Sequence, residues 1–135
     1  MQIDNLVVIV TFLALLTYFW TCFRVGGLRG KHHIPAPAVT GHPEFERAYR
    51  VQLNTLEWLP LFLPSLWLFA YYWDGRVAAV IGVFWILGRV LYGTSYVKDP
   101  TKRGPGFGIQ ALCTAILLFG ALGKAVWLVA TTHAV

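Results

Sequence analysis

Four long apolar runs, separated by short segments rich in charge, proline or glycine, constrain the fold of this chain more than any other feature. The runs cover about residues 3–23, 45–72, 77–97 and 107–130. A bilayer's hydrocarbon core is about 30 Å thick and a helix rises about 1.5 Å per residue, so runs of ~20 residues suit membrane-spanning helices. Backbone groups in lipid must satisfy one another, which favours helices. We therefore predict an all-α integral membrane protein, a four-helix transmembrane bundle forming one domain over residues 1–135.

The composition agrees with a membrane protein. The 135 residues are 57% hydrophobic and 13% charged, and the mean hydropathy is +0.60, whereas a soluble domain would cover its core with charge. Basic residues beside membrane spans meet anionic headgroups, so the net charge of +5 predicts no nucleic-acid partner. Cys22 and Cys113 lack CxxC spacing, and the four histidines show no ligand spacing. We therefore expect neither a disulfide framework nor a metal site.

Basic residues gather in two of the three connections between runs. Residues 24–31 and 98–103 carry three basic side chains each, whereas the turn at residues 73–76 carries one. Positive charge tends to stay in the cytoplasm, so we expect both basic loops there and both termini outside, in a bacterial inner membrane or the endoplasmic reticulum. Prolines and glycines predict loops over residues 24–44 and 98–106. The first run lacks a signal-peptide cleavage site and should be retained as a helix.

Two polar stripes interrupt the apolar runs. On the second predicted helix, residues at steps of four, four and three share one face: Glu46, Arg50, Asn54 and Glu57. On the third, residues at steps of three and four do the same: Arg89, Tyr92 and Tyr96. A central Arg or Glu costs about 2.5 to 3.5 kcal/mol on insertion scales. The stripes therefore predict a ligand or mutual partners that offset this cost.

The chemistry of these side chains favours binding of a small zwitterion over hydrolysis. No serine or cysteine has an evident histidine and carboxylate partner, and neither paired carboxylates nor a Walker loop is present. Guanidinium groups bind carboxylates, a carboxylate binds an ammonium, and tyrosines donate hydrogen bonds, so the set fits a peptide-like ligand. The alternative is that Arg50, Glu57 and Arg89 pair with one another and only hold helices together.

Two segments resemble the MAPEG family, the membrane-associated proteins in eicosanoid and glutathione metabolism. They are FERAYRVQLNTLEWLPLF at residues 45–62 and ILGRVLYGTSYVKDPTKRGPG at residues 86–106. The chain is most similar to the type 3 microsomal glutathione S-transferases. The resemblance implies a four-helix protomer, a homotrimer, and a glutathione site between adjacent protomers near the cytosolic membrane face.

The resemblance also implies roles for individual residues. Those that would hold glutathione are Arg29, Arg50, Gln52, Asn54, Glu57, Tyr92 and Tyr96, and Arg103 would activate the thiol. A free thiol with a pKa of about 8.5 is only a few per cent thiolate at pH 7. An adjacent Arg that lowered this pKa by about two would make the nucleophilic thiolate the majority form. We assign Arg89 to helix pairing, with Glu57 or a carbonyl as its partner.

Two positions depart from the leukotriene-C synthase pattern of the family: Trp58 replaces a tyrosine and Gly30 replaces a second loop arginine. We expect a membrane-embedded glutathione transferase that acts on lipophilic electrophiles and extends to lipid hydroperoxides as a glutathione peroxidase. The lipophilic substrate would enter from the bilayer along aromatic residues such as Trp58, Trp67 and Trp85. The alternatives are a non-catalytic lipid-binding or scaffold protein of the same fold and a small transporter. The family's non-catalytic member lacks arginines at Arg50 and Arg103, which favours the enzyme.

Overall fold

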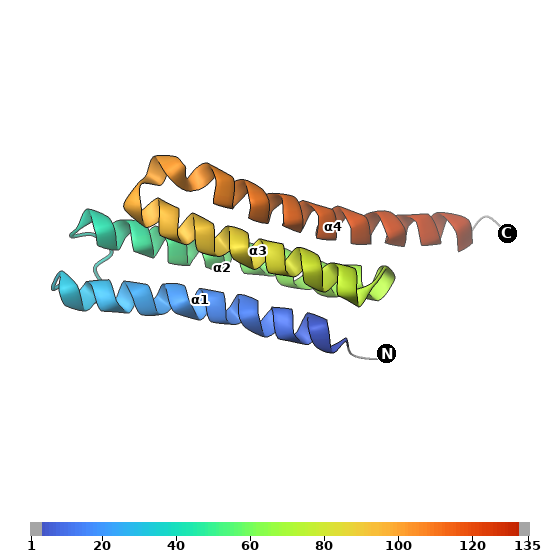
Figure 1. The fold of residues 1–135 in the computed structure, drawn as a ribbon, viewed down its shortest axis with the longest axis horizontal. Helices are drawn as coiled ribbons and strands as arrows, with labels where there is room; N and C mark the ends of the chain where they lie inside the picture. Colours follow the sequence, from blue (N-terminus) through green and yellow to red (C-terminus); the bar gives the residue numbers. More distant parts are fainter. Residues whose placement is uncertain (1–3, 133–135) are drawn as a thin grey trace.

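The computed structural model describes residues 4–132, and four long helices make up most of this range. Helix α1 spans Asn5–Lys31, α2 spans Pro43–Tyr72, α3 spans Gly75–Lys98 and α4 spans Gly104–Thr132, with a short 3-10 helix, η1, at Pro100–Arg103. The four helices lie side by side along the long axis of the molecule (Figure 1). Among the described residues, three segments are long and apolar enough to cross a membrane, namely α1, α3 and Pro100–Thr132. The predicted all-α four-helix membrane fold is confirmed.

The helices alternate in direction, so the connections sort to the two ends of the bundle. The α1–α2 connection and η1 lie at one end, and the α2–α3 turn lies at the other, together with the start of α1 and the end of α4 (Figure 1). Both basic connections therefore share one end of the molecule. Their placement on the cytoplasmic side of a membrane stays a prediction.

Side-chain caps explain where the helices begin. The carboxylate of Asp74 accepts hydrogen bonds from the backbone N–H groups of Arg76 and Val77 at 2.8 and 2.9 Å, which fixes the α2–α3 turn. Asp4 accepts from the N–H of Leu6 at 2.9 Å in the same way. Helix α2 begins at a proline that follows the cap His42, a position where the missing N–H costs nothing.

Helix α1 is longer than the sequence predicts, because it continues past residue 23 to Lys31. Three glycines favoured a loop there, but Gly26, Gly27 and Gly30 all remain helical. Glycine costs only about 1 kcal/mol in a helix interior, and Val25 and Leu28, which pack in the core, continue the helix through this stretch. The break comes after His32, where His33 adopts a left-handed φ of 53°.

The second predicted loop, residues 98–106, is also more regular than expected. Pro100 opens η1, and α4 already begins at Gly104 rather than near residue 107. Proline disrupts a helix interior but is compatible with a first turn, which is where both Pro100 and Pro105 stand. The segment is therefore a defined bend that holds Arg103 at the end of η1.

The core is built from apolar side chains of all four helices. The rings of Phe62 and Trp85 stack with centroids 4.0 Å apart, and Trp85 donates a hydrogen bond to Oγ1 of Thr114 at 3.1 Å. Trp85 is fully buried, so the expectation that it lines a substrate groove is wrong. It occupies an inward position of α3, where a large ring fills space between helices.

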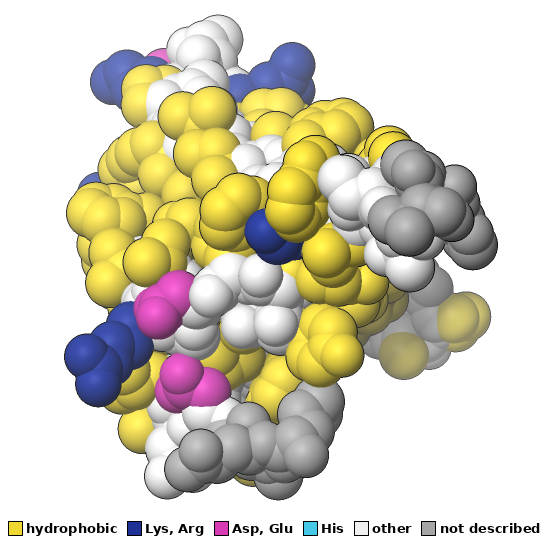
Figure 2. Space-filling model, turned by 90° about the vertical axis from the view of Figure 1, so that its right-hand side faces the viewer, with side chains coloured by type: hydrophobic (Ala, Val, Ile, Leu, Met, Phe, Trp, Pro, Cys, Tyr) yellow, Lys and Arg dark blue, Asp and Glu magenta, His cyan; other side chains and the backbone are white. Residues whose placement is uncertain are grey.

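The outer surface of the bundle is strongly apolar. Large hydrophobic side chains are more than half exposed on α1, α3 and α4, for example Phe12, Phe84 and Phe119. In an end-on view hydrophobic side chains cover most of the visible surface and charged ones are few (Figure 2). Exposure on this scale suits contact with lipid rather than water.

Candidate functional site

The polar face of α2 carries an open ion pair. Nη1 of Arg50 lies 3.4 Å from Oε1 of Glu57, and the two side chains are 51% and 55% exposed. Both residues belong to α2, so this pair does not join one helix to another. An exposed pair of this kind is worth about 0.2 to 1 kcal/mol, so a ligand can replace it at little cost.

Arg89 lies in the buried interface between α3 and α2, and its side chain is only 1% exposed. It donates hydrogen bonds to Oδ1 of Asn54 at 2.9 Å and to Oγ1 of Thr55 at 2.7 Å. Its guanidinium also lies 4.5 Å from the centre of the Tyr92 ring. The predicted helix-pairing role of Arg89 is confirmed. Of the two predicted partners, Glu57 is wrong, and the carbonyl that accepts from Arg89 is the side-chain amide of Asn54. Glu57 points outward on α2, whereas Asn54 and Thr55 point inward.

The predicted four-residue stripe on α2 therefore divides between two surfaces. Arg50 and Glu57 are exposed, Glu46 is half-buried, and Asn54 is buried against Arg89. Residues at steps of three and four do not lie on a single line but cover a broad strip of the helix surface. Asn54 lies on the side of this strip that faces the core. Thr55, the second partner of Arg89, is a residue that the sequence analysis missed, since a threonine beside an asparagine carries no signal of its own.

Two tyrosines on α3 form the neighbouring part of the site. Tyr92 is almost fully buried and Tyr96 half-buried, and their ring centroids are 5.5 Å apart. Phe107 of α4 lies 6.1 Å from Tyr92 and 5.5 Å from Trp58 of α2, so aromatic rings link three helices here. Within residues 4–132 neither tyrosine hydroxyl has a hydrogen-bond partner, which leaves both available to a ligand.

Arg103 ends η1 and is exposed, and no hydrogen bond or ion pair involves its side chain in the described part of the chain. The start of η1 is fixed by Asp99, whose carboxylate accepts from Oγ1 and N of Thr101 at 2.7 and 3.0 Å. These hydrogen bonds, the hydroxyl one above all, hold the pKa of Asp99 below its usual value. The side chain of Arg103 is thus available to bind a ligand, and the backbone that carries it is held in place by the hydrogen bonds of Asp99.

The two remaining predicted residues stand apart from this group. Arg29 donates to the carbonyl of Ala38 at 2.7 Å and lies 4.8 Å above the Phe45 ring, so it orders the α1–α2 connection. Gln52 is half-buried on α2. Within the described residues, no hydrogen bond joins Arg29 or Gln52 to Arg50, Glu57 or the tyrosines. The single chain therefore brings together only part of the predicted set.

Two further arginines support the α3 end of the site. Arg47 donates to the carbonyls of Val97 and Lys98 at 3.4 and 3.3 Å, and Arg24 donates to that of Gly93 at 3.3 Å. Val97 and Lys98 end α3, so Arg47 satisfies free acceptors there and complements the helix dipole, whereas Arg24 reaches a carbonyl inside the helix. The sequence analysis counted such arginines only as topology signals, since nothing in the sequence shows which carbonyls they reach.

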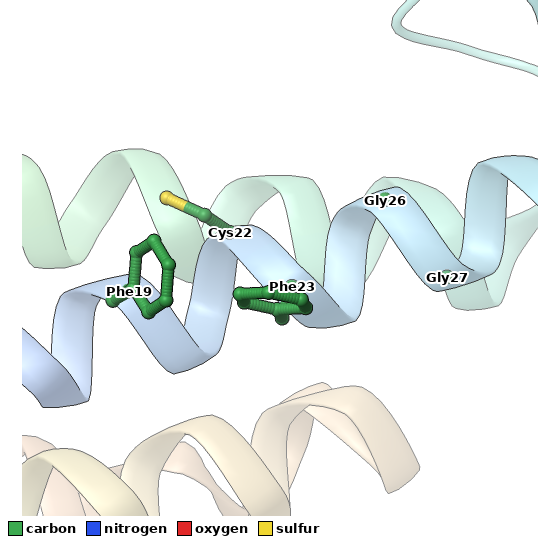
Figure 3. A pocket seen from close by; sticks show the side chains of 5 residues that line it. All are labelled: Phe19, Cys22, Phe23, Gly26 and Gly27. Carbon is green, nitrogen blue, oxygen red and sulfur yellow. The ribbon is translucent and has the colours of Figure 1, made fainter.

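An apolar hollow of about 500 Å³ lies on the surface of α1. Its lining residues are Phe19, Cys22, Phe23, Gly26 and Gly27. The two rings lie next to each other on α1, and the helix beyond them carries no side chain at the two glycines (Figure 3). Among the residues that the structure describes, none that lines the hollow carries a charge. It can accept an acyl chain, an apolar side chain of another helix, or a lipophilic small molecule.

Comparison with known proteins places these features in a family. The model of the MAPEG family matches residues 7–123. An uncharacterized protein of Synechocystis sp. is 45% identical over 119 residues, covering 88% of this chain and 87% of that protein. Human microsomal glutathione S-transferase 2 is 40% identical over 120 residues, which cover 86% of this chain and 80% of that protein. Leukotriene C4 synthase of Cavia porcellus is 36% identical over 115 residues, which cover 84% of this chain and 77% of that protein. The specific likeness to type 3 enzymes stays a prediction. The chain is a member of the MAPEG family.

Proposed function

We propose that this protein is a membrane-embedded glutathione transferase that conjugates glutathione to lipophilic electrophiles. The observation that carries the proposal is the guanidinium of Arg103, which has no partner among the described residues and ends η1. This 3-10 helix lies at the end of the bundle where α2, the helix of the open Arg50–Glu57 pair, begins (Figure 1). Relatives named as a glutathione S-transferase and a leukotriene C4 synthase support the same chemistry. The proposal includes glutathione peroxidase activity toward lipid hydroperoxides as a second reaction of the same thiolate.

The α2 pair supplies the charges that a zwitterionic tripeptide requires. Arg50 binds a carboxylate of glutathione and Glu57 binds its ammonium group, so the ligand replaces a weak exposed pair with two charge-assisted contacts. Tyr92 and Tyr96 add hydroxyl donors from α3. Asn54 takes part through its amide nitrogen, because its oxygen already accepts from Arg89.

Arg103 activates the thiol. Its positive charge beside the sulfur favours the thiolate over the neutral thiol, and Arg suits this task because it keeps its proton at all relevant pH values. A pKa lowered by about two is worth roughly 2.7 kcal/mol and makes thiolate the majority form at pH 7. The thiolate then attacks the electrophilic carbon of a lipid that arrives from the bilayer, and a C–S bond forms as a leaving group or a π electron pair is displaced. With a lipid hydroperoxide the thiolate attacks the terminal oxygen, the O–O bond breaks and the lipid alcohol leaves. A second glutathione then reduces the resulting sulfenic acid, which gives glutathione disulfide and water.

We propose that the site is completed by a neighbouring protomer in a homotrimer, as the family resemblance implies. Arg29 and Gln52, which make no hydrogen bond to the other site residues within residues 4–132 of one chain, are the residues that a neighbour would contribute. The basic end of the bundle faces the cytosol in this arrangement, where glutathione is available. Trp58, Phe107 and the hollow on α1 offer the apolar surface for the second substrate.

The test uses purified full-length protein in detergent or lipid nanodiscs. Glutathione binding is measured by calorimetry, and the rate of conjugation is measured with a chromogenic model electrophile. Both measurements are made on the parent protein, Arg103→Ala and Lys102→Ala. Lys102 is the matched control, since it is an exposed cation one residue earlier in η1. We expect Arg103→Ala to bind glutathione but lose at least about a hundredfold in turnover, with Lys102→Ala near the parent. Glutathione binding without turnover in the parent would indicate the non-catalytic scaffold instead.

A further inference from the structure

The connection between α1 and α2 brings three metal-ligating side chains together. His32 follows the end of α1, His42 precedes the start of α2, and Glu44 lies in the first turn of α2. One donor atom from each of these residues lies within 4.8 Å of the others. His32 Nε2 and Glu44 Oε2 are 2.9 Å apart. Two imidazoles and a carboxylate from two helix ends therefore converge, although the spacing in the sequence predicts no metal site.

One of the two histidine rings is free to adjust. The rings stack with centroids 3.6 Å apart and planes 11° from parallel, so their in-plane lone pairs do not yet point at one ion. His42 is exposed, and among the described residues its ring makes a single hydrogen bond, a long contact of 3.2 Å in which Nδ1 accepts from the N–H of Glu44. A bond at the limit of normal length gives way easily. Rotation of the His42 ring therefore completes a site in which His32 and Glu44 are already close.

Besides Arg24, whose charge interacts with that of Glu44 at longer range, the charged group recorded at the cluster in the described part of the chain is Lys31. Its Nζ lies 3.1 Å from the same Glu44 oxygen, and its side chain is 61% exposed, compared with 15% for His32. A cation bound at Glu44 would displace the lysine ammonium, which is free to turn into solvent. An exposed pair of this kind is weak, so Lys31 lowers the affinity for a metal without preventing binding.

We propose that His32, His42 and Glu44 bind a divalent transition metal ion of the Zn²⁺ class. Imidazole nitrogens with one carboxylate oxygen suit Zn²⁺, Ni²⁺ and Cu²⁺, whereas Mg²⁺ and Ca²⁺ require sites dominated by oxygen. Three protein ligands leave one position for water. The ion joins the end of α1 to the start of α2, so its binding stabilises the connection that Arg29 also orders.

The experiment titrates Zn²⁺ into untagged full-length protein in detergent, without glutathione or chelators, and follows binding by calorimetry. Co²⁺ is titrated in parallel because its visible absorption reports nitrogen and oxygen ligation. We expect one ion per chain and no displacement by excess Mg²⁺. His32→Ala and His42→Ala should each weaken Zn²⁺ binding by at least about tenfold. Loss of a residue that only hydrogen-bonds to a metal ligand already weakens binding about tenfold, and loss of a ligand itself should weaken it more.

His33→Asn is the matched control. His33 is the neighbour of His32, lies outside the cluster and has a positive φ that asparagine tolerates, so this variant should bind Zn²⁺ like the parent. If a histidine variant unfolds, Glu44→Gln replaces it, because it keeps the size of the side chain and removes the charge. The proposal is overturned if the parent shows no saturable Zn²⁺ binding, or if His33→Asn weakens it as much as the ligand variants do.

Discussion

The guanidinium of Arg89 donates a hydrogen bond of 2.9 Å to the amide oxygen of Asn54, across the buried interface of α3 and α2. This contact explains how an almost fully buried cation is tolerated in a chain that spans a membrane. The guanidinium also reaches Thr55 and the face of the Tyr92 ring, so polar and aromatic groups replace part of the water that it loses, while its Nε has no hydrogen-bond partner among the described residues. Arg89 thereby fixes two candidate ligand residues, Asn54 and Tyr92, relative to each other.

Arg89→Ala is expected to destabilise the protein by about 2 kcal/mol. Side-chain hydrogen bonds between membrane helices average about 0.6 kcal/mol, those to charged groups reach about 1.5 to 3, and here two are lost. Unfolding in mixed detergent micelles measures the change. Arg76→Ala, at the opposite end of the bundle with an exposed side chain, serves as the control and should be neutral. An Arg89→Ala variant as stable as the parent would show that these hydrogen bonds contribute nothing.

The coupling between Arg89 and Asn54 can be measured by a double-mutant cycle. We expect Arg89→Ala and Asn54→Ala to be non-additive by about 1 kcal/mol, because each removes the same hydrogen bond. The same four proteins should be assayed for glutathione binding. If Asn54 also contacts the ligand, adding Asn54→Ala to Arg89→Ala should weaken glutathione binding further. If glutathione binding is not weakened further, Asn54 only holds the helices together.

Gly106→Ala is expected to lower both stability and turnover. A Cβ at this position would lie 2.7 Å from Cα of Tyr92 and 2.8 Å from the carbonyl oxygen of Gly88, and backbone atoms of α3 cannot move aside as a side chain can. The start of α4, and Arg103 just before it, would shift away from Tyr92. Gly108→Ala is the control, since nothing lies within 4 Å of its Cβ position. Equal melting temperatures for the two variants would contradict this account.

The lowered pKa of Asp99 predicts an acid-dependent loosening of η1. Because the folded-state pKa lies below the ordinary value, Asp99 stabilises the fold above that ordinary value, and this contribution is lost as the pH falls through the folded pKa. Asp99→Asn keeps a side chain that can cap η1 but has no group that gains a proton in acid. Stability measured from pH 6 down to about pH 3 should therefore fall more steeply in the parent than in Asp99→Asn, since aspartate normally titrates near about 3.9. Parallel curves would exclude this role for Asp99.

Much of the fold was predictable from the sequence, because apolar runs and breakers are local signals. The turn at Asp74 and Gly75 and the four helices follow directly from them. The end of α1 differs from the prediction because glycine is only mildly unfavourable in a helix, and the packing of Val25 and Leu28 against other helices is not visible in the sequence. The partners of Arg89 and the convergence of His32 with His42 depend on how helices meet, which residue spacing within one helix does not encode. The roles of the site residues came from family resemblance, and they remain predictions for this chain.

The central claim is that Arg103 stabilises the thiolate of bound glutathione. The most direct measurement is a pH titration of the ultraviolet thiolate absorbance of glutathione bound to the parent protein, to Arg103→Ala and to Lys102→Ala. We predict a thiol pKa about two below the free value of about 8.5 in the parent and in Lys102→Ala, and a return close to the free value in Arg103→Ala. The same low pKa in all three proteins would contradict the role of Arg103, and absence of a bound thiolate in the parent would contradict the proposed enzyme.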